Sequence, residues 1–274
     1  MKTEKDLKLA VLIDADNVPY AYVKEMFEEI AKYGTPTFKR IYADWTKPTV
    51  SGWKKVLLEN AITPIQQYSY SQGKNSSDSA LIIDAMDILY TGKVDGFCIV
   101  SSDSDFTRLA TRLREAGMTV IGIGEKKTLT PFITACDKFI YLEILKSKNR
   151  DEEPDEEKPQ AVKPQDTQPL NKVDPEIINL FADTISDLAD EDGWAYLGDL
   201  GSLMMKKKPD FDSRNYGFTK LLPLIKSIAL FEVDERDSGR GKGKHIYIRK
   251  AAKKAKRRGQ RRSSKGIQAP AEEK

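Results

Sequence analysis

The sequence predicts an α/β domain with a mostly parallel sheet, followed by a small winged helix. In the first half of the 274-residue chain, short apolar runs alternate with stretches of helical spacing. A charged segment that contains four prolines then interrupts the pattern, and helices followed by two β-like runs resume after it. At roughly 100 to 200 residues per domain, this length accommodates one medium and one small domain.

The first domain, residues 1–146, is built from predicted strands that alternate with predicted helices. The strands are the apolar runs 9–13, 36–42, 62–66, 97–100 and 119–123. The helices are the stretches 20–33, 50–60, 79–90 and 106–116, and a helix-strand unit over 129–142 closes the domain. This alternation indicates a parallel sheet with helices on both faces.

A disordered linker is predicted over residues 147–172, because prolines and charges there leave too little apolar surface to form a core. The second domain, 173–250, has helical spacing over 175–188, 197–206 and 214–228. Two β-like runs follow at 231–234 and 245–248, joined by a glycine-rich turn over 237–244. Three helices and a hairpin predict a winged helix.

The tail, residues 251–274, carries nine basic and two acidic residues, so the first 250 residues have a net negative charge. Like-charge repulsion favours a disordered tail, and such tails bind nucleic acid nonspecifically or act as solubilising segments. The basic centre of this tail includes Arg257 and Arg258.

Composition also restricts the compartment and the chemistry. Cys98 and Cys136 form neither a disulfide framework nor a zinc pattern, which favours a reduced, cytoplasmic setting. No stretch approaches 18 uncharged apolar residues, and the N-terminus has no cleavage site, so neither a membrane span nor export is expected. The only histidine, His245, lies in the second domain, which argues against a zinc-histidine site or a histidine-based mechanism in the first.

Acidic residues follow or precede the elements of the first domain where a site is expected. Asp14 and Asp16 end the first strand, Asp103 and Asp105 end a later one, and Asp78 begins a helix. Parallel α/β sheets bind ligands at the carboxyl ends of their strands, so these three segments are expected to converge. Carboxylates that share a pocket repel one another unless a cation neutralises them. Mg²⁺ is the natural cation, and Mn²⁺ is an alternative, because both prefer oxygen ligands and suit phosphodiester hydrolysis.

Helix capping is the alternative explanation of these acids. Asp, Asn and Ser before a helix are ordinary N-caps, and Asn17 before Pro19, or Ser104 or Asp105 before Phe106, fits that role. A cap needs one short polar residue, whereas each of the two strand ends supplies an additional acid. That redundancy favours a metal site.

The first domain resembles the NYN domains, PIN-like nucleases that include a bacterial LabA-like group. The resemblance covers about residues 9–145 and depends on the ordered series LIDADN, K-x-x-x-D from Lys74 to Asp78, VSSDSDF and ITACDKFIYL. It implies a PIN-like fold in which Asp14, Asp78 and Asp103 are the core metal-binding, catalytic acids. It also implies that Asp16 and Asp105 support the metal site, that Asp105 takes part in catalysis, and that Asn17 is a supporting residue. Ser101 would position a carboxylate, and Lys74 would contact phosphate.

The second domain resembles the OST-HTH, or LOTUS, domains over about residues 174–249. The matching features are Gly193-Trp194, the leucines of 197–203, the turn Pro209-Asp210-Phe211, Tyr216-Gly217 and Phe231-Glu232-Val233. The resemblance implies a winged helix that binds RNA. The binding residues expected there are Lys206, Lys207 and Lys208, together with Arg240, Lys242 and Lys244 of the wing.

Three functions are therefore compared. The first is a Mg²⁺-dependent ribonuclease, an endonuclease or an exonuclease, guided by its RNA-binding module. The second is a noncatalytic RNA-binding regulator in which the acid pocket is structural. The third is a phosphatase, because Asp14-Ala-Asp16 after a strand also resembles the opening of haloacid-dehalogenase-type enzymes, in which the first Asp is the nucleophile. RNA is the expected partner, no membrane is involved, and a homo-oligomer is compatible with the sequence.

Overall fold

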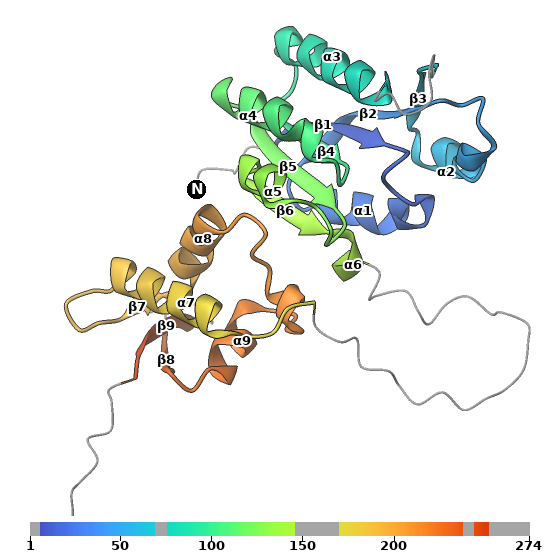
Figure 1. Cartoon of the computed structure of the whole chain (residues 1–274). Helices are drawn as coiled ribbons and strands as arrows, with labels where there is room; N and C mark the ends of the chain where they lie inside the picture. Colours follow the sequence, from blue (N-terminus) through green and yellow to red (C-terminus); the bar gives the residue numbers. More distant parts are fainter. Residues whose placement is uncertain (1–5, 69–75, 146–169, 238–243, 252–274) are drawn as a thin grey trace, which may run out of the picture.

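The computed structural model describes residues 6–68, 76–145, 170–237 and 244–251, and within these ranges the chain forms an α/β domain and a smaller domain beside it (Figure 1). Residues 147–169 of the predicted linker (147–172), residues 238–243 of the wing and the tail beyond Ala251 lie outside the described residues. Both predicted classes, an α/β sheet with flanking helices and a small domain of helices with an antiparallel sheet, are confirmed.

The large sheet has six strands, all paired in parallel, in the order β3-β2-β1-β4-β5-β6. The strands are β1 (Lys8–Asp14), β2 (Thr35–Ala43), β3 (Thr63–Gln66), β4 (Gly96–Val100), β5 (Thr119–Gly124) and β6 (Lys138–Tyr141). Residues 9–13 of β1 are 0 % exposed, because both faces of this central strand are covered. A strand buried on both faces reads as a continuous apolar run, which is why it was predictable.

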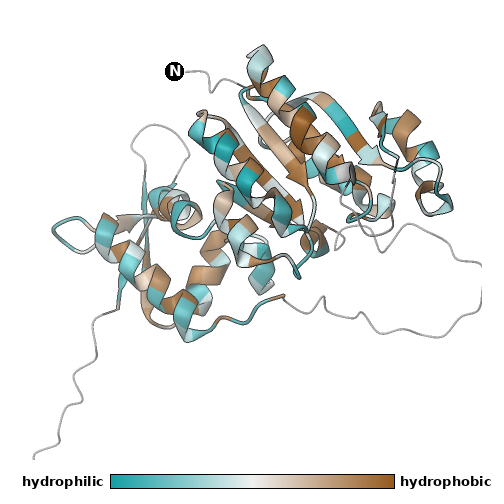
Figure 2. Ribbon diagram, turned by 45° about the horizontal axis from the view of Figure 1, so that its top comes forward, coloured by the Kyte–Doolittle hydropathy of each residue, from teal (hydrophilic) through white to brown (hydrophobic). Residues whose placement is uncertain are grey.

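Helices cover the sheet in two layers, and alternate β1 residues belong to different cores (Figures 1 and 2). Leu9, Val11 and Ile13 pack toward α1 (Val23–Ile30), α2 (Trp53–Asn60) and α6 (Leu142–Leu145). Ala10 and Leu12 pack toward α3 (Ser76–Thr91), α4 (Thr107–Glu115) and α5 (Thr130–Ala135). Successive side chains of a strand point to opposite faces, so one strand contributes to both layers.

The small domain contains α7 (Pro175–Leu188), α8 (Leu197–Lys207), α9 (Leu221–Ser227) and a three-stranded antiparallel sheet. Its strands are β7 (Ala195–Tyr196), β8 (Phe231–Asp237) and β9 (Lys244–Lys250), in the order β7-β9-β8. The core forms around Phe181, which packs edge-on against Phe211 and Phe231.

In the small domain one sequence prediction is wrong, and one strand was not predicted. The helix predicted over 214–228 is interrupted: a 3-10 turn, η5 (Ser213–Tyr216), ends at Gly217, and α9 starts only at Leu221. Gly217 has φ 82°, a left-handed conformation that glycine adopts without steric cost and that ends a helix. The two-residue strand β7 was not predicted, because a run of that length has no detectable alternation.

The second domain contacts β6, the edge strand of the large sheet. The backbone N–H of Phe139 donates to the carbonyl of Pro209 at 2.9 Å, and the Tyr141 hydroxyl donates to Asp210 Oδ2 at 2.9 Å. Leu170, at the end of the predicted linker, packs against both cores of the first domain, while Asn171 N donates to the Asn215 carbonyl at 2.7 Å. An exposed sheet edge is a template for unwanted pairing, so this contact protects it.

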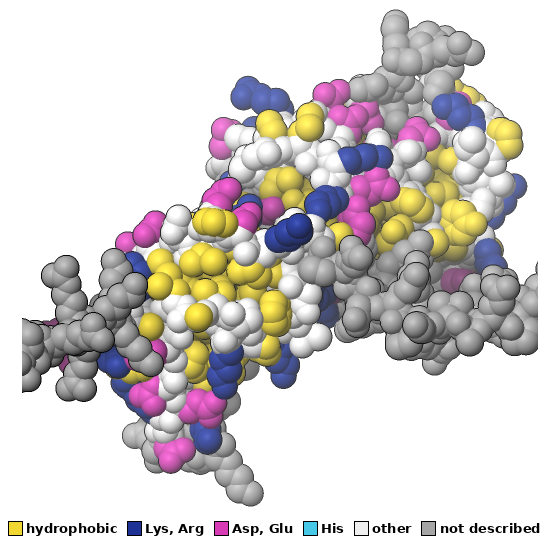
Figure 3. All heavy atoms as spheres, turned by 60° about the horizontal axis from the view of Figure 1, so that its bottom comes forward, with side chains coloured by type: hydrophobic (Ala, Val, Ile, Leu, Met, Phe, Trp, Pro, Cys, Tyr) yellow, Lys and Arg dark blue, Asp and Glu magenta, His cyan; other side chains and the backbone are white. Residues whose placement is uncertain are grey.

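On the face shown in Figure 3, acidic and basic side chains are interspersed, and hydrophobic side chains gather over the second domain. Among the helices in the described ranges, none is both long and apolar enough to cross a bilayer.

Candidate functional site

The predicted acids lie at the carboxyl edge of the large sheet, where the strand order reverses. β1 ends at Asp14, its neighbour β4 ends at Val100, and Ser101 and Asp103 follow directly. The chain continues from β1 toward β2 on one side, and β4 lies on the other, so the crevice between β1 and β4 is the switch point of the sheet. Ligands of open α/β sheets bind at this position.

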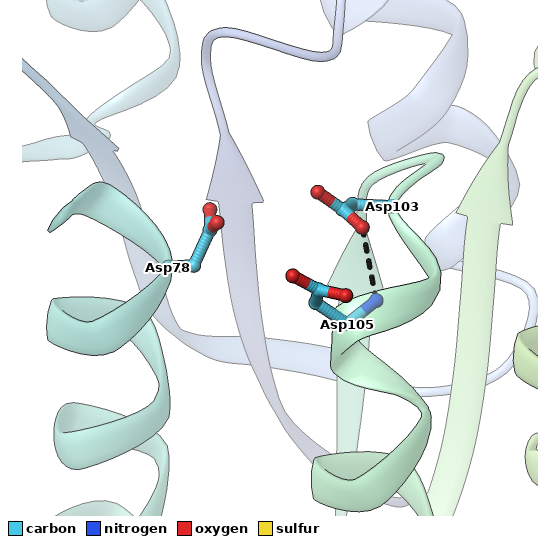
Figure 4. A group of neighbouring side chains, drawn as sticks. All are labelled: Asp78, Asp103 and Asp105. Carbon is cyan, nitrogen blue, oxygen red and sulfur yellow. Dashed lines mark hydrogen bonds between the residues drawn. The ribbon is translucent and has the colours of Figure 1, made fainter. Parts of the chain in front are cut away.

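Three carboxylates converge there: Asp78, Asp103 and Asp105 each offer an oxygen atom, and these atoms lie within 4.8 Å of one another. Asp78 comes from the first turn of α3, and the other two come from the loop and 3-10 turn after β4 (Figure 4). Asp78 is buried, Asp103 half-buried and Asp105 exposed. The group therefore opens to solvent on the Asp105 side. These three residues are called the acid trio below.

The loop after β4 is shaped by side-chain hydrogen bonds to its own backbone. Asp103 Oδ1 accepts from Asp105 N at 2.9 Å, so Asp103 caps the turn η3 (Ser104–Phe106). Ser101 Oγ accepts from Asp103 N at 3.1 Å and donates to Asp14 Oδ2 at 2.9 Å. The residue that caps this turn is therefore Asp103, through one carboxylate oxygen, and not Ser104 or Asp105 as predicted. The Asp103 carboxylate still faces the other acids (Figure 4).

Asp14 is 1 % exposed, and its carboxylate is close enough to the trio for its charge to act on Asp78. Its Oδ2 also accepts from Asn17 Nδ2 at 2.6 Å, and its Oδ1 accepts from Asp16 N at 3.2 Å. Asn17 therefore bonds to the site rather than capping the following turn, whose first flanking residue is Pro19. Asp14 and the exposed Asp16, which were also predicted to bind the metal, are not part of the acid trio that the described residues form. Asp14 is placed to orient Ser101 and, through it, the Asp103 backbone.

The electrostatics of the site penalise negative charge. Burial, followed by the negative charges of Asp14, Asp103, Asp105 and Asp16, raises the pKa of Asp78 to about 6. Burial also raises the pKa of Asp14, against the hydrogen bonds from Asn17 and Ser101. Among the described residues, no lysine or arginine forms an ion pair with Asp14 or Asp78. A cation at this point would relieve the repulsion.

The donor set fits a hard divalent cation. It consists of carboxylate oxygens, the ligands that Mg²⁺ and Mn²⁺ prefer, and it contains no thiolate or imidazole. Oxygens on opposite sides of one Mg²⁺ lie about 4 Å apart, twice the usual metal-oxygen distance. The trio spans a separation of that order.

One further acid at the same sheet edge was not singled out from the sequence. Asp44 follows β2 in IYADW, the same strand-then-acid pattern as at Asp14, and it is 8 % exposed. Its Oδ1 accepts from the Thr46 backbone N at 3.2 Å, the Thr46 hydroxyl at 2.6 Å and Gln66 Nε2 at 3.1 Å. These bonds give Asp44 a role in the turn after β2.

The predicted RNA-binding lysines of the second domain differ in their surroundings. Lys206 is exposed, whereas Lys207 pairs with Asp187 at 2.6 Å and Lys208 with Asp210 at 3.3 Å. Lys244 at the start of β9 pairs with Glu235 at 3.2 Å. The other predicted basic residues lie outside the described residues: Lys74, Arg240, Lys242, Arg257 and Arg258.

Comparison with known families agrees with this architecture. Residues 8–143 match the NYN domain, and residues 168–242 match the OST-HTH/LOTUS domain. No curated protein matches the chain.

Among solved structures, a protein of unknown function from Vibrio parahaemolyticus is 21 % identical, with a TM-score of 0.43, over 51 % of this chain and 94 % of its own. An uncharacterised protein from Nitrosomonas europaea is 29 % identical, with a TM-score of 0.29, over 36 % of this chain and 93 % of its own. Part of a Chromobacterium violaceum protein is 32 % identical, with a TM-score of 0.24, over 30 % of this chain and 86 % of that structure.

Proposed function

The chain belongs to the NYN domain family, which is part of the PIN-like nuclease superfamily, and carries an OST-HTH/LOTUS domain after it; we propose that it is a metal-dependent endoribonuclease. The observation that carries the proposal is the acid trio, in which three carboxylates from two segments meet at the switch point of a parallel sheet. Such a cluster is costly to the fold, so its presence is best explained by a cation and a phosphodiester that bind there.

Within this proposal, the residues of the site have distinct tasks. Asp78, Asp103 and Asp105 hold the cation, and the exposed position of Asp105 leaves the solvent side open for a phosphodiester. Asp14 and Ser101 fix the loop that carries Asp103, through bonds of 2.9 and 3.1 Å. When bound, Mg²⁺ or Mn²⁺ supplies activation of water and neutralisation of charge on the leaving oxygen.

A phosphatase with Asp14 as nucleophile is disfavoured by the burial of that residue. A nucleophilic carboxylate must contact the phosphorus atom, whereas Asp14 is 1 % exposed and its oxygens accept bonds from Ser101 and Asn17. A noncatalytic RNA-binding regulator would have the same two folds as the proposed enzyme. Only a measurement of RNA cleavage distinguishes these two functions.

The test is incubation of the purified full chain with linear and circular RNA in Mg²⁺, in Mn²⁺ and in excess chelator. Conversion of circular RNA to linear products in either metal, and its loss in chelator, is the expected result. Cleavage that continues in chelator contradicts the metal mechanism. RNA binding without cleavage in either metal favours the regulator.

A further inference from the structure

The small sheet of the second domain has one face toward the core and one face away from it. Ala195 and Ile248 are paired across β7 and β9, and both are 0 % exposed. Their neighbours Tyr196 and Tyr247 are also paired. Because side chains alternate along a strand, the two tyrosines stand on the outer face.

Aromatic rings are gathered on that outer face. The Tyr196 ring lies 5.9 Å from the Tyr247 ring and 5.6 Å from the ring of His245, measured between centroids. Tyr196 is 39 % exposed, and His245 is exposed as well. Trp194 precedes Tyr196 by two residues and points to the same side of the sheet, as its contacts with the arginines of that side show.

Two guanidinium groups lie against these rings. Arg236 of β8 is 4.3 Å from the Tyr247 ring centroid and 5.2 Å from that of Trp194, and Arg249 of β9 is 4.4 Å from that of Trp194. The outer face is thus a set of flat groups contributed by all three strands. These six residues, Trp194, Tyr196, Arg236, His245, Tyr247 and Arg249, are called the ring platform.

The charge of the ring platform argues against a simple phosphate site. Arg236 pairs with Asp234 at 2.8 Å, and Arg249 pairs with Glu232 at 2.8 Å, so acids offset both arginines. Lys244 and Lys250, at the two ends of β9, add no positive charge to this face. Both alternate with the outer residues and so share the face of the buried Ile248, and they bond Glu235 and Ser186. A face of planar groups whose charges are offset fits the flat faces of bases better than it fits phosphates.

We propose that the ring platform stacks the unpaired bases of single-stranded RNA. The inference rests on the proposed function, because it specifies how the second domain would hold the substrate of the acid trio. Paired bases hide their faces inside a duplex, whereas rings and guanidinium planes need an open base face. This site is separate from the α8 lysines that the sequence predicted.

The experiment measures RNA binding by the full chain that carries Asp78→Asn, which prevents cleavage during the titration. Fluorescence anisotropy with a labelled single-stranded 12-mer is compared for Tyr196→Leu, Tyr247→Leu, the ring-preserving Tyr196→Phe and Tyr247→Phe, and Tyr90→Leu. Tyr90 is the matched control, since it is a 75 % exposed tyrosine on α3. Thermal melting of each variant verifies folding.

Each leucine variant is expected to weaken binding by about tenfold, within the range known for loss of one base-stacking ring. The salt dependence of binding should stay unchanged, because no phosphate contact is lost. The phenylalanine variants and Tyr90→Leu should bind as the parent does, and a duplex of the same sequence should compete poorly.

Parental affinity in both leucine variants, or equal competition by the duplex, overturns the inference. Failure of the inference is distinct from failure of the proposed function. A parent that binds RNA independently of these tyrosines removes only the ring platform. A wild type that cleaves no RNA in any metal, with binding still lost in the leucine variants, removes the nuclease and leaves the ring platform.

Discussion

Carboxylates are buried in two parts of this molecule, and their surroundings differ. At the contact between the domains, Glu29 and Asp212 lie against the guanidinium of Arg214, with Glu29 oxygens at 2.9 and 2.8 Å from its terminal nitrogens. At the carboxyl edge of the sheet, Asp14 and Asp78 lie among other carboxylates. The first group has its cation within the chain, and the second has none among the described residues.

The two groups titrate in opposite directions for that reason. Burial alone would raise the pKa of Glu29, but hydrogen bonds and charge from Arg214 and Lys32 outweigh it and lower the pKa to about 2. Burial and neighbouring acids instead raise the pKa of Asp78 to about 6. The comparison teaches that burial alone does not decide whether these acids are charged. A guanidinium lowers the pKa of Glu29 in spite of its burial, whereas neighbouring acids add to the effect of burial on the pKa of Asp78.

The largest expected effect is on cleavage. Asp78→Asn removes a proposed metal ligand while retaining size and hydrogen-bonding capacity, so RNA cleavage should fall by about three orders of magnitude or more. Asp87→Asn, the same change at an exposed position of the same helix, should cleave as the wild type does. Rates are measured under single-turnover conditions in Mn²⁺. Equal rates in the two variants would break the distinction between the acid trio and ordinary surface acids.

The next effect is on stability at the domain contact. Arg214→Ala leaves Glu29 buried without its main counter-charge, which should destabilise the protein by about 3 to 5 kcal/mol in denaturant unfolding. The double variant Glu29→Gln/Arg214→Ala should recover part of that loss, because the buried Glu29 charge is removed while Asp212 still lacks its guanidinium partner. A loss below about 1 kcal/mol for Arg214→Ala would mean that the guanidinium is not what keeps this contact closed.

Acidification should separate the two groups of acids in metal-free protein. The pKa of Asp78 is raised, so its negative charge destabilises the folded protein above pH 6. This destabilisation disappears as the pH falls toward 3.8, the pKa of the same carboxyl in the unfolded chain. Glu29 has a lowered pKa, so its stabilising charge is present above 4.5 and is lost as the pH falls toward 2. Stability should therefore rise between pH 6 and 4.5, by at most about 3 kcal/mol, and fall below that. A stability curve that is flat from pH 6 to 4.5, or no different in Asp78→Asn, would refute the assignment.

The smallest predicted effect concerns the residue that links Asp14 to Asp103. Ser101→Ala removes the hydroxyl that bonds both the Asp14 carboxylate and the Asp103 backbone, so cleavage should fall by about 10- to 100-fold through poorer positioning. The apparent metal affinity, measured from the Mn²⁺ dependence of the rate, should weaken as well. A wild-type rate with wild-type metal dependence would show that the loop holds its shape without Ser101.

The acid trio was predictable because parallel strands bring their carboxyl ends to one edge, whatever the length of chain between them. Residues as distant as Asp14 and Asp103 could thus be assigned to one site from strand order alone. The difference in role between Asp14, which is buried and accepts hydrogen bonds, and Asp105, which is exposed, depends on side-chain orientation. Sequence patterns do not specify that orientation.

The contact between the domains was not predictable. Glu29 and Arg214 are 185 residues apart, and on their own elements each reads as an ordinary charged surface residue. Their pairing depends on how two separately folded units dock. The ring platform was missed for a related reason, because its register joins β9 to a strand of only two residues, Ala195–Tyr196, which is too short to show alternation.

The measurement that tests the central claim most directly is calorimetric titration of the metal-free full chain with Mn²⁺, in wild type, Asp78→Asn and Asp87→Asn. Because burial and neighbouring acids raise the pKa of Asp78 and no lysine or arginine of the described residues forms an ion pair with it, wild type and Asp87→Asn should bind Mn²⁺, and Asp78→Asn should lose most of that affinity. No binding up to millimolar Mn²⁺ in wild type, or equal binding in Asp78→Asn, would contradict the account.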